Sequence, residues 1–175
     1  MEVMVRPPRT GIEAFGLMPE GTLCQLINDV LIMSPAPNIP HANAQNEIFT
    51  ALFTYVKEHR LGVVYSPVVD VYLNDKNVYQ PDIFFISNTR KDIIEDSGIY
   101  GAPDLVIEIL SKGNQKYDLS EKKEVYKSSG VKEYWVVDPQ TKWCEGFVLE
   151  NAQFKSVGET TGVLTVRMFD LKITF

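Results

Sequence analysis

The run of residues 104–110 (DLVIEIL) constrains the fold more than any other segment of this chain. Its apolar residues occupy both faces of an extended backbone, a pattern typical of a central strand that is covered on both sides. Sheets covered on both faces by helices are characteristic of the α/β class. We therefore predict an α/β fold with this run in the middle of its sheet.

The same run carries a carboxylate, Glu108, that requires a partner. An ionised Glu buried without a partner costs several kcal/mol or takes up a proton. Because side chains alternate along a strand, Asp104, Val106, Glu108 and Leu110 share one face, and Leu105, Ile107 and Ile109 share the other. The two acids of this strand are therefore expected to point the same way.

Asp82 is a second acid beside an apolar run. It follows Pro81 directly and precedes residues 83–86 (IFFI). The chain between Asp82 and Glu108 is long enough to leave one strand and return on a neighbour, with the two carboxylates side by side. Adjacent carboxylates repel unless a cation lies between them. Since no sulfur or histidine cluster is present to select a softer metal, we predict magnesium (Mg²⁺) or Mn²⁺ with oxygen ligands, held by Asp82 and Glu108.

Elements upstream of the central strand are indicated by apolar periodicity and by turn residues. Residues 22–33 predict a β-hairpin that turns at Asn28-Asp29, and the three prolines of residues 34–40 predict a turn. Apolar residues at helical spacing predict a helix over about 41–60, ended by Gly62. Residues 63–73 and 78–87 then predict an antiparallel pair of strands joined by the polar residues 74–77.

Downstream of the central strand, residues 117–129 predict a helix that ends at Gly130, with Asp118 or Ser120 available as its cap. Residues 133–137 (EYWVV) predict the next strand, in which Trp135 is expected to be a core residue. Short strands are predicted over residues 144–149, 153–157 and 164–168, and the chain closes with the apolar tail 169–175.

Bulk composition is that of a globular protein. The 175 residues, 45% hydrophobic and 23% charged, predict a single domain over residues 1–175. Cys24 and Cys144 are isolated, which favours buried reduced thiols over zinc ligands or a disulfide framework. No apolar run approaches the roughly 20 residues that cross a bilayer, and no signal peptide is evident, so we expect a cytoplasmic protein without a membrane partner.

The formal net charge of −6 argues against a protein that binds nucleic acid through its overall field. A local basic patch or a bound divalent cation can still reverse the sign of the field at one site. The charge therefore lowers the expectation of a nuclease without excluding one.

Lys122 lies four residues after Asp118 on the predicted helix, where it can project toward the edge of the sheet. A lysine beside a bound metal can hold a phosphate and stabilise the charge that develops on it. Taken alone, however, such a residue is more often a solvated helix lysine.

Several motifs in the same order resemble a known family. They are residues 102–111 (APDLVIEILS), 116–119 (KYDL) with Lys122 and Tyr126, 130–131 (GV), 133–139 (EYWVVDP), 80–82 (QPD), His41 and 33–35 (MSP). Together they resemble the Uma-type family of restriction endonucleases, formerly catalogued as a domain of unknown function. The resemblance covers nearly the whole chain.

This resemblance implies a place in the PD-(D/E)XK nuclease superfamily. The superfamily's αβββαβ core agrees with the order of elements above, so we expect a restriction endonuclease-like PD-(D/E)XK core with an N-terminal β-hairpin and additional C-terminal strands. By motif, Asp82 supplies the first acid and Glu108 the second. Leu110 stands where the superfamily has its lysine, and the family supplies that lysine from the following helix as Lys122. Asn28-Asp29 also departs from the Asp-Gly that is common in the family.

Five further residues are auxiliary candidates. Glu47 is either an additional metal-site acid on the first helix or a solvent-facing residue, and His41 either caps the helix start or lines the cleft. Tyr117 and Asp118 either brace Lys122 or cap the second helix. Asp104 shares the face of Glu108.

The predicted reaction is metal-dependent hydrolysis of a nucleic-acid phosphodiester, with DNA as the substrate. Asp82 and Glu108 hold the metal, an activated water attacks phosphorus, and Lys122 stabilises the pentavalent charge. By analogy with enzymes that cut two strands, we expect a homodimer. The rival interpretation is an inactive nuclease-fold module for binding or assembly, consistent with the acidic composition and the missing Glu-x-Lys. A third is a small-molecule hydrolase that uses the same carboxylates.

Overall fold

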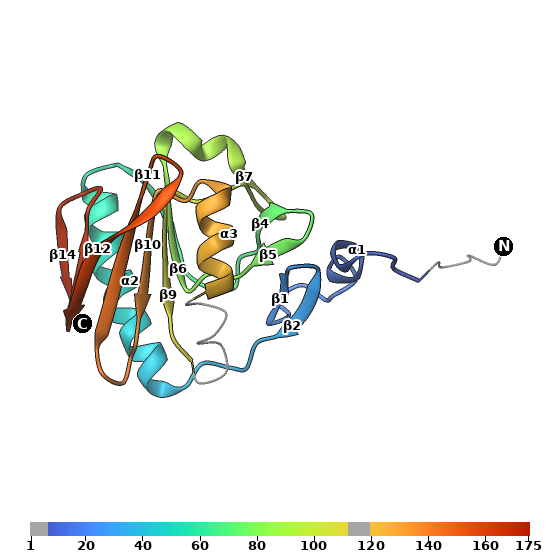
Figure 1. Ribbon diagram of the computed structural model, residues 1–175, viewed down its shortest axis with the longest axis horizontal. Coiled ribbons are helices and arrows are strands. Elements are labelled where there is room, and N and C mark those ends of the chain that lie inside the picture. Colours follow the sequence, from blue (N-terminus) through green and yellow to red (C-terminus); the bar gives the residue numbers. More distant parts are fainter. Residues whose placement is uncertain (1–6, 112–119) are drawn as a thin grey trace.

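The computed structural model describes residues 7–111 and 120–175 (Figure 1). Within these residues one six-stranded sheet consists of β3 (Gly62–Tyr65), β6 (Ile83–Ser87), β9 (Leu105–Ile109), β10 (Glu133–Val137), β11 (Trp143–Glu150) and β12 (Gln153–Thr161). Its strand order is β12-β11-β10-β9-β6-β3. Helix α2 (Ile39–Glu58) packs on one face of this sheet, and α3 (Lys122–Ser129) packs on the other.

A second sheet of six strands is also found in the described part of the chain. It consists of β1 (Cys24–Ile27), β2 (Val30–Met33), β4 (Val71–Asn74), β5 (Asn77–Tyr79), β7 (Ile94–Glu95) and β8 (Gly98–Tyr100), in the order β2-β1-β5-β4-β8-β7. Figure 1 shows it beside α3, on the side from which the N-terminal part of the chain extends. The remaining elements are α1 (Gly11–Phe15), the 3-10 helix η1 (Asn88–Ile93), β13 (Val163–Val166) and β14 (Leu171–Thr174).

The predicted central strand is confirmed as β9. It pairs in parallel with β10 and antiparallel with β6, and every one of its residues is buried. Leu105, Ile107 and Ile109 join the hydrophobic core under α2, whereas Val106 joins the core under α3. The predicted division of the strand into two faces is therefore correct, and Glu108 points to the α3 side.

The predicted hairpin of β1 and β2 is also confirmed. Asn28 and Asp29 have φ values of 52° and 67°, the left-handed backbone that a two-residue hairpin turn requires at both positions. Asn and Asp tolerate this conformation better than other residues with a side chain. The backbone N–H of Asn28 donates to Asn77 Oδ1 at 2.9 Å, which ties the turn to β5.

Helix α2 begins and ends two residues before its predicted bounds. Asn38 caps it, since its side-chain oxygen accepts a hydrogen bond from the backbone N–H of His41 at 3.0 Å. The prediction that Gly62 ends the helix was wrong, because Gly62 is the first residue of β3. A Cβ at this position would lie 2.1 Å from the backbone oxygen of Ile86, so the close pairing of β3 with β6 requires glycine.

The two long strands predicted for residues 63–73 and 78–87 each divide between the two sheets. β3 and β6 pair antiparallel in the first sheet, and β4 and β5 pair antiparallel in the second, so the predicted pairing direction is correct. Pro67 and Pro81 lie in the breaks, where no ladder hydrogen bond is needed from their nitrogen. The break at Pro81 leaves Asp82 immediately before β6.

The end of α3 and the position of β10 agree with the sequence. Gly130 caps α3 with φ 89°, and β10 spans the predicted residues. Residues 117–119 of the predicted helix lie outside the described residues. The apolar tail forms a strand, β14, which pairs with β13 and contributes Ile173 and Phe175 to the core under α2. None of the described helices is long and apolar enough to cross a membrane.

Candidate metal centre

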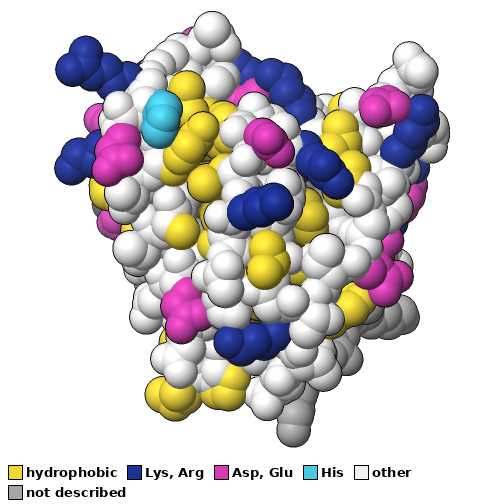
Figure 2. Space-filling model, turned by 90° about the vertical axis from the view of Figure 1, so that its left-hand side faces the viewer, with side chains coloured by type: hydrophobic (Ala, Val, Ile, Leu, Met, Phe, Trp, Pro, Cys, Tyr) yellow, Lys and Arg dark blue, Asp and Glu magenta, His cyan; other side chains and the backbone are white. Residues whose placement is uncertain are grey.

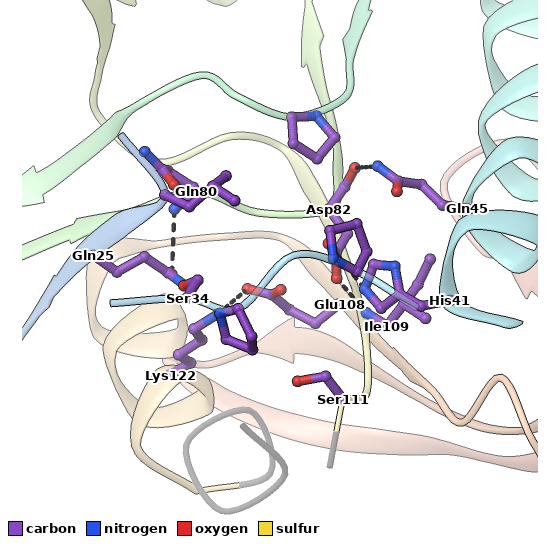
Figure 3. Close-up of a pocket in the computed structure, with 14 residues that line it drawn as sticks. Gln25, Ser34, His41, Gln45, Gln80, Asp82, Glu108, Ile109, Ser111 and Lys122 are labelled. Carbon is purple, nitrogen blue, oxygen red and sulfur yellow. Dashed lines mark hydrogen bonds and ion pairs between the residues drawn. The ribbon is translucent and has the colours of Figure 1, made fainter. Parts of the chain in front are cut away.

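A polar pocket lies where β6 begins and β9 ends (Figure 3). Its volume is about 90 Å³. The hairpin, α2, β9, α3 and the segment before β6 each contribute to its wall. The polar side chains that line it are Gln25, Ser34, His41, Gln45, Gln80, Asp82, Glu108, Ser111 and Lys122.

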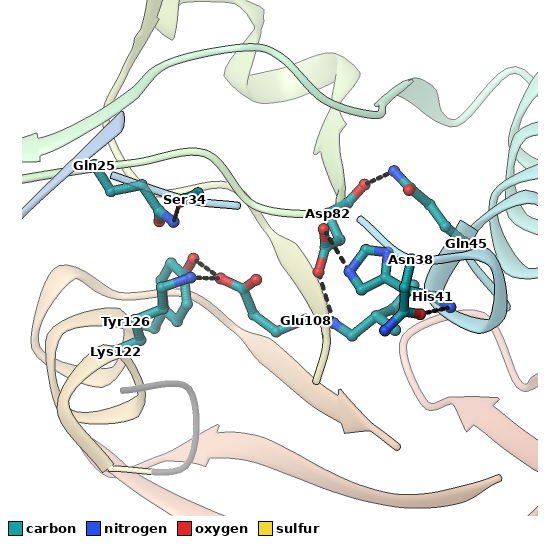
Figure 4. Close-up of polar contacts among 10 residues, drawn as sticks. Gln25, Ser34, Asn38, His41, Gln45, Asp82, Glu108, Lys122 and Tyr126 are labelled. Carbon is teal, nitrogen blue, oxygen red and sulfur yellow. Dashed lines mark hydrogen bonds and ion pairs between the residues drawn. The ribbon is translucent and has the colours of Figure 1, made fainter. Parts of the chain in front are cut away.

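Asp82 is held in place by β9 and by α2 (Figure 4). In the β6–β9 ladder Ile83 pairs with Ile107, and continuing this register by one residue sets Asp82 opposite Glu108. Asp82 Oδ2 accepts a hydrogen bond from the backbone N–H of Ile109 at 2.8 Å, and its Oδ1 lies 3.2 Å from His41 Nε2. Gln45 Nε2 donates to the backbone oxygen of Asp82 at 3.1 Å. Backbone and side chain of Asp82 are therefore both anchored.

Glu108 is held from the other side by α3. It is only 2% exposed, and its Oε1 accepts hydrogen bonds from Lys122 Nζ at 3.0 Å and from the Tyr126 hydroxyl at 2.6 Å. Lys122 and Tyr126 are four residues apart and thus share one face of the helix. These contacts compensate much of the cost of burying the carboxylate.

Tyr126 is a hydrogen-bond donor to this carboxylate at neutral pH. Its complete burial, followed by the negative charge of Glu108, raises its pKa well above the ordinary value for tyrosine. The hydroxyl therefore keeps its proton. The hydrogen bond from Tyr126 therefore orients the Glu108 carboxylate, and the ion pair with Lys122 balances its charge.

His41 is buried at the start of α2. Burial by itself lowers its pKa, but the hydrogen bond to Asp82 and the negative charges of Asp82 and Glu108 outweigh burial, so the pKa lies above its ordinary value. The second ring nitrogen, Nδ1, and the Ser111 hydroxyl are buried without a hydrogen-bond partner among the described residues. The pocket thus leaves polar atoms available to water or a ligand.

The structure brings together four of the residues that the sequence singled out: Asp82, Glu108, Lys122 and His41. Glu47 is not among them, because it is exposed and lines a concavity between α2 and β14. Asp104 lies at the opposite end of β9, where its carboxylate accepts from the backbone N–H of Ser87 at 2.8 Å. Tyr117 and Asp118 lie outside the described residues.

Core predictions agree with the structure as well. Trp135 is 2% exposed, and its Nε1 donates to Glu133 Oε1 at 2.7 Å. Cys24 and Cys144 are buried free thiols.

Five polar residues that line the pocket, and Tyr126, the partner of Glu108, were not singled out from the sequence as site residues. The five are Gln25, Ser34, Gln45, Gln80 and Ser111. The spacing of Tyr126 from Lys122 was a usable signal, since residues four apart on a helix are neighbours. Gln45 has no such signal, because its role depends on contact with the backbone of Asp82, 37 positions away in the sequence.

The donor set of the pocket fits a small divalent cation. No group of three or more His, Cys, Asp or Glu side chains in residues 7–111 and 120–175 forms a complete metal cage. Mg²⁺, however, is commonly held by one or two carboxylates, with water and substrate oxygens filling its other positions. Asp82 and Glu108, facing one polar pocket, provide that kind of site.

A family comparison matches almost the entire chain. Residues 12–174 match the family Uma2, which is described as "Putative restriction endonuclease". The chain belongs to the Uma2 family. A search of curated protein sequences finds no significant match.

The Uma2 chain is also similar to a solved structure from Anabaena variabilis ATCC 29413, described as a "putative nuclease belonging to DUF820". The two proteins are 21% identical, the match covers 95% of each chain, and the TM-score is 0.78. This likeness establishes the restriction endonuclease-like α/β fold predicted from the sequence.

Proposed function

We propose that this Uma2 protein is a metal-dependent endonuclease that hydrolyses phosphodiester bonds in DNA. The observation that carries the proposal is the meeting of Asp82 and Glu108, from neighbouring strands, at one polar pocket where the buried Lys122 contacts Glu108. The description of the family supports a nuclease.

Asp82 and Glu108 are the residues that would hold Mg²⁺ or Mn²⁺. When bound, such an ion supplies Lewis acidity and lowers the pKa of water to give a nucleophile at neutral pH. Each carboxylate is already oriented, Asp82 by Ile109 and His41, and Glu108 by Tyr126. Because both carboxylates are already held in place, little conformational entropy is lost when a ligand binds.

Lys122 is the proposed stabiliser of the transition state. Lys122 is 2% exposed, and its Nζ lies 3.0 Å from Oε1 of Glu108, the carboxylate that is proposed to hold the metal. In a site that excludes water, a fixed positive charge stabilises the negative charge that develops on the phosphoryl oxygens. The contact with Glu108 holds the ammonium group of Lys122 at the wall of the pocket.

The pocket volume favours a polymer over a small molecule as substrate. At about 90 Å³ it is far smaller than the roughly 300–1,000 Å³ of clefts that enclose whole small-molecule ligands. A single phosphodiester group can reach the carboxylates while the attached sugars and bases stay outside. This argues against the small-molecule hydrolase.

The experiment is a nicking assay on supercoiled plasmid and on single-stranded DNA with purified protein. We expect cleavage with Mg²⁺ or Mn²⁺ and none with EDTA. Cleavage that continues undiminished in EDTA would contradict metal dependence, and absence of cleavage on every DNA and RNA tested would favour an inactive binding module. A cytoplasmic location and a homodimer remain predictions.

A further inference from the structure

A groove runs along the outer edge of β3, away from the pocket that holds Asp82. Its volume is about 460 Å³, and α2, β3 and η1 form its walls. We refer to it as the β3 groove and define it by Phe53, Lys57, Arg60, Val63, Tyr65 and Lys91. Strand β3 is the last strand of its sheet, so this edge is not covered by a further strand in the described residues.

The charged side chains that line the β3 groove are all positive. Lys57, Arg60 and Lys91 are all exposed there, and none of the described residues that line the groove is acidic. This contrasts with the net charge of −6 for the chain. A local concentration of cations on an acidic protein indicates an anionic partner.

The acids of α2 lie on its other side. Glu47 and Glu58 line the concavity between α2 and β14. Figure 2 shows the face of the molecule that carries β14, where acidic and basic side chains are interspersed. The segregation of Lys57 and Arg60 from these acids is therefore a local property of the β3 groove.

An exposed aromatic ring lies among these cations. Phe53 is 40% exposed, and Lys57 Nζ lies 5.6 Å from the centre of its ring. Aromatic side chains interleaved with cations are the combination that binds nucleic-acid strands, because bases stack on rings while lysine and arginine contact phosphates. The chemistry of the groove thus matches a nucleic-acid strand better than a purely anionic small ligand.

Strand β3 leads from the groove toward the pocket, since its last residue, Tyr65, pairs with Phe84, two residues after Asp82. Tyr65 lines the groove, and Pro67 lines the pocket. Two residues span at most about 7 Å, so Tyr65 and Pro67 lie close together. From Gly62 to Tyr65 strand β3 rises roughly 10 Å, about three nucleotide steps along one strand of a duplex.

From these observations we propose that the β3 groove binds the nucleic-acid strand on one side of the phosphodiester that is cleaved. Lys57, Arg60 and Lys91 contact its phosphates, and Phe53 stacks on a base. This inference rests on the proposed nuclease function, and it adds the path by which the substrate reaches Asp82 and Glu108.

The test measures binding separately from cleavage. Fluorescence anisotropy with a labelled 20-nucleotide DNA, single-stranded and duplex, is measured in EDTA for the wild-type protein and for the variant Lys57→Ala/Arg60→Ala/Lys91→Ala. A matched control, Lys155→Ala/Arg167→Ala/Lys172→Ala, removes the same charge from exposed positions on β12, on β14 and next to β13. Hydrolysis of bis(p-nitrophenyl) phosphate with Mn²⁺ reports on the pocket alone.

We expect the groove variant to bind DNA at least about tenfold more weakly. The slope of the logarithm of its binding constant against the logarithm of salt concentration should fall by the amount that about three lost phosphate contacts would give. It should hydrolyse the small ester at the wild-type rate, and the control should bind normally. Phe53→Ala should weaken single-strand binding without changing the salt dependence.

Equal DNA binding by the wild-type protein and the groove variant would overturn the β3 groove as a binding site while leaving the nuclease intact. Equal weakening in the control would overturn it too, because the effect would then arise from net charge. A wild-type protein that neither binds nor cleaves DNA would instead overturn the proposed function.

Discussion

Glu108, in β9, and Asp104, immediately before it, are both almost completely buried, at 2% and 1% exposure, yet their surroundings differ. Asp104 accepts from the backbone of Ser87 and pairs with Lys132 at 2.6 Å, a lysine whose side chain is 57% exposed. Glu108 contacts the buried Lys122 and Tyr126 and lines a pocket. Burial of a carboxylate therefore does not by itself identify a functional site. A buried carboxylate that lines a pocket together with its hydrogen-bond partner is the better indicator.

A third buried acid, Glu133, strengthens this comparison. It is 1% exposed, and its carboxylate accepts from Trp135 Nε1 and from the backbone N–H groups of Arg167 and Met168 at 2.7, 2.7 and 2.9 Å. These donors are fixed parts of the fold. Glu133 ties β10 to the turn after β13 and has a structural role.

The largest difference between the two kinds of acid is expected in activity. Glu108→Gln and Asp82→Asn should each lower DNA cleavage about 1000-fold, because losing a metal ligand removes several kcal/mol of transition-state stabilisation. Asp104→Asn should stay within about threefold of wild type. A plasmid nicking assay measures the cleavage rate of each variant, and circular dichroism checks that each is folded. If Asp104→Asn were fully folded yet inactive, the distinction between a structural Asp104 and a functional Glu108 would be wrong.

Lys122→Met should lower the rate of cleavage about 100-fold, mainly in kcat, since its charge is proposed to act in the transition state. The matched control is Lys123→Met. Lys123 Nζ lies 3.4 Å from the centre of the Phe147 ring, on another side of α3, and this change should leave the rate within a factor of two. Single-turnover kinetics on a labelled duplex separate the two variants, and equal rates for both would remove Lys122 from the mechanism.

Glu133→Ala should mainly affect stability. It leaves one buried and two partly buried N–H donors without their acceptor, so we expect the free energy of unfolding to fall by about 3 kcal/mol. Glu150→Ala, at a position whose side chain is 53% exposed, should change it by less than about 0.5 kcal/mol. Urea unfolding followed by fluorescence measures this. A cleavage rate per folded molecule that falls in Glu133→Ala would assign it a functional role.

The smallest expected effect is the pH dependence that Asp104 confers. Burial raises its pKa, but hydrogen bonds from Lys132 and Ser87 outweigh burial, so the pKa lies below its ordinary value. A lowered folded-state pKa stabilises the protein above the unfolded-state value of about 3.9, and this contribution is lost as pH falls through the folded-state pKa. The stability difference between wild type and Asp104→Asn, about 1 kcal/mol at pH 6, should therefore shrink toward pH 3. Urea unfolding at both pH values tests this, and a constant difference would contradict it.

The sequence predicts the parts of this fold that depend on local pattern. The apolar runs of β9 and β10, the turn at Asn28-Asp29 and the cap at Gly130 each carry their own signal. Elements that depend on distant packing were not predicted. The extended runs around Pro67 and Pro81 look continuous in sequence, because nothing local reveals that the two halves belong to different sheets.

The same distinction applies to the candidate site. Asp82 and Glu108 are identifiable because a charge beside an apolar strand needs an explanation. Glu47 and Gln45 lie two positions apart on α2, and only the packing of that helix decides that Gln45 lines the pocket and Glu47 faces outward. Successive residues of a helix point about 100° apart. A small error in how the helix is turned about its axis therefore changes which of the two side chains faces the pocket.

The central claim is that Asp82 and Glu108 together hold a divalent cation, and the most direct test is a crystal structure with Mn²⁺ read by anomalous scattering. We expect one strong peak in the pocket within bonding distance of both carboxylates, and its loss in Asp82→Asn. A pocket that stays empty at saturating Mn²⁺, or a peak at Asp104 in its place, would contradict the claim.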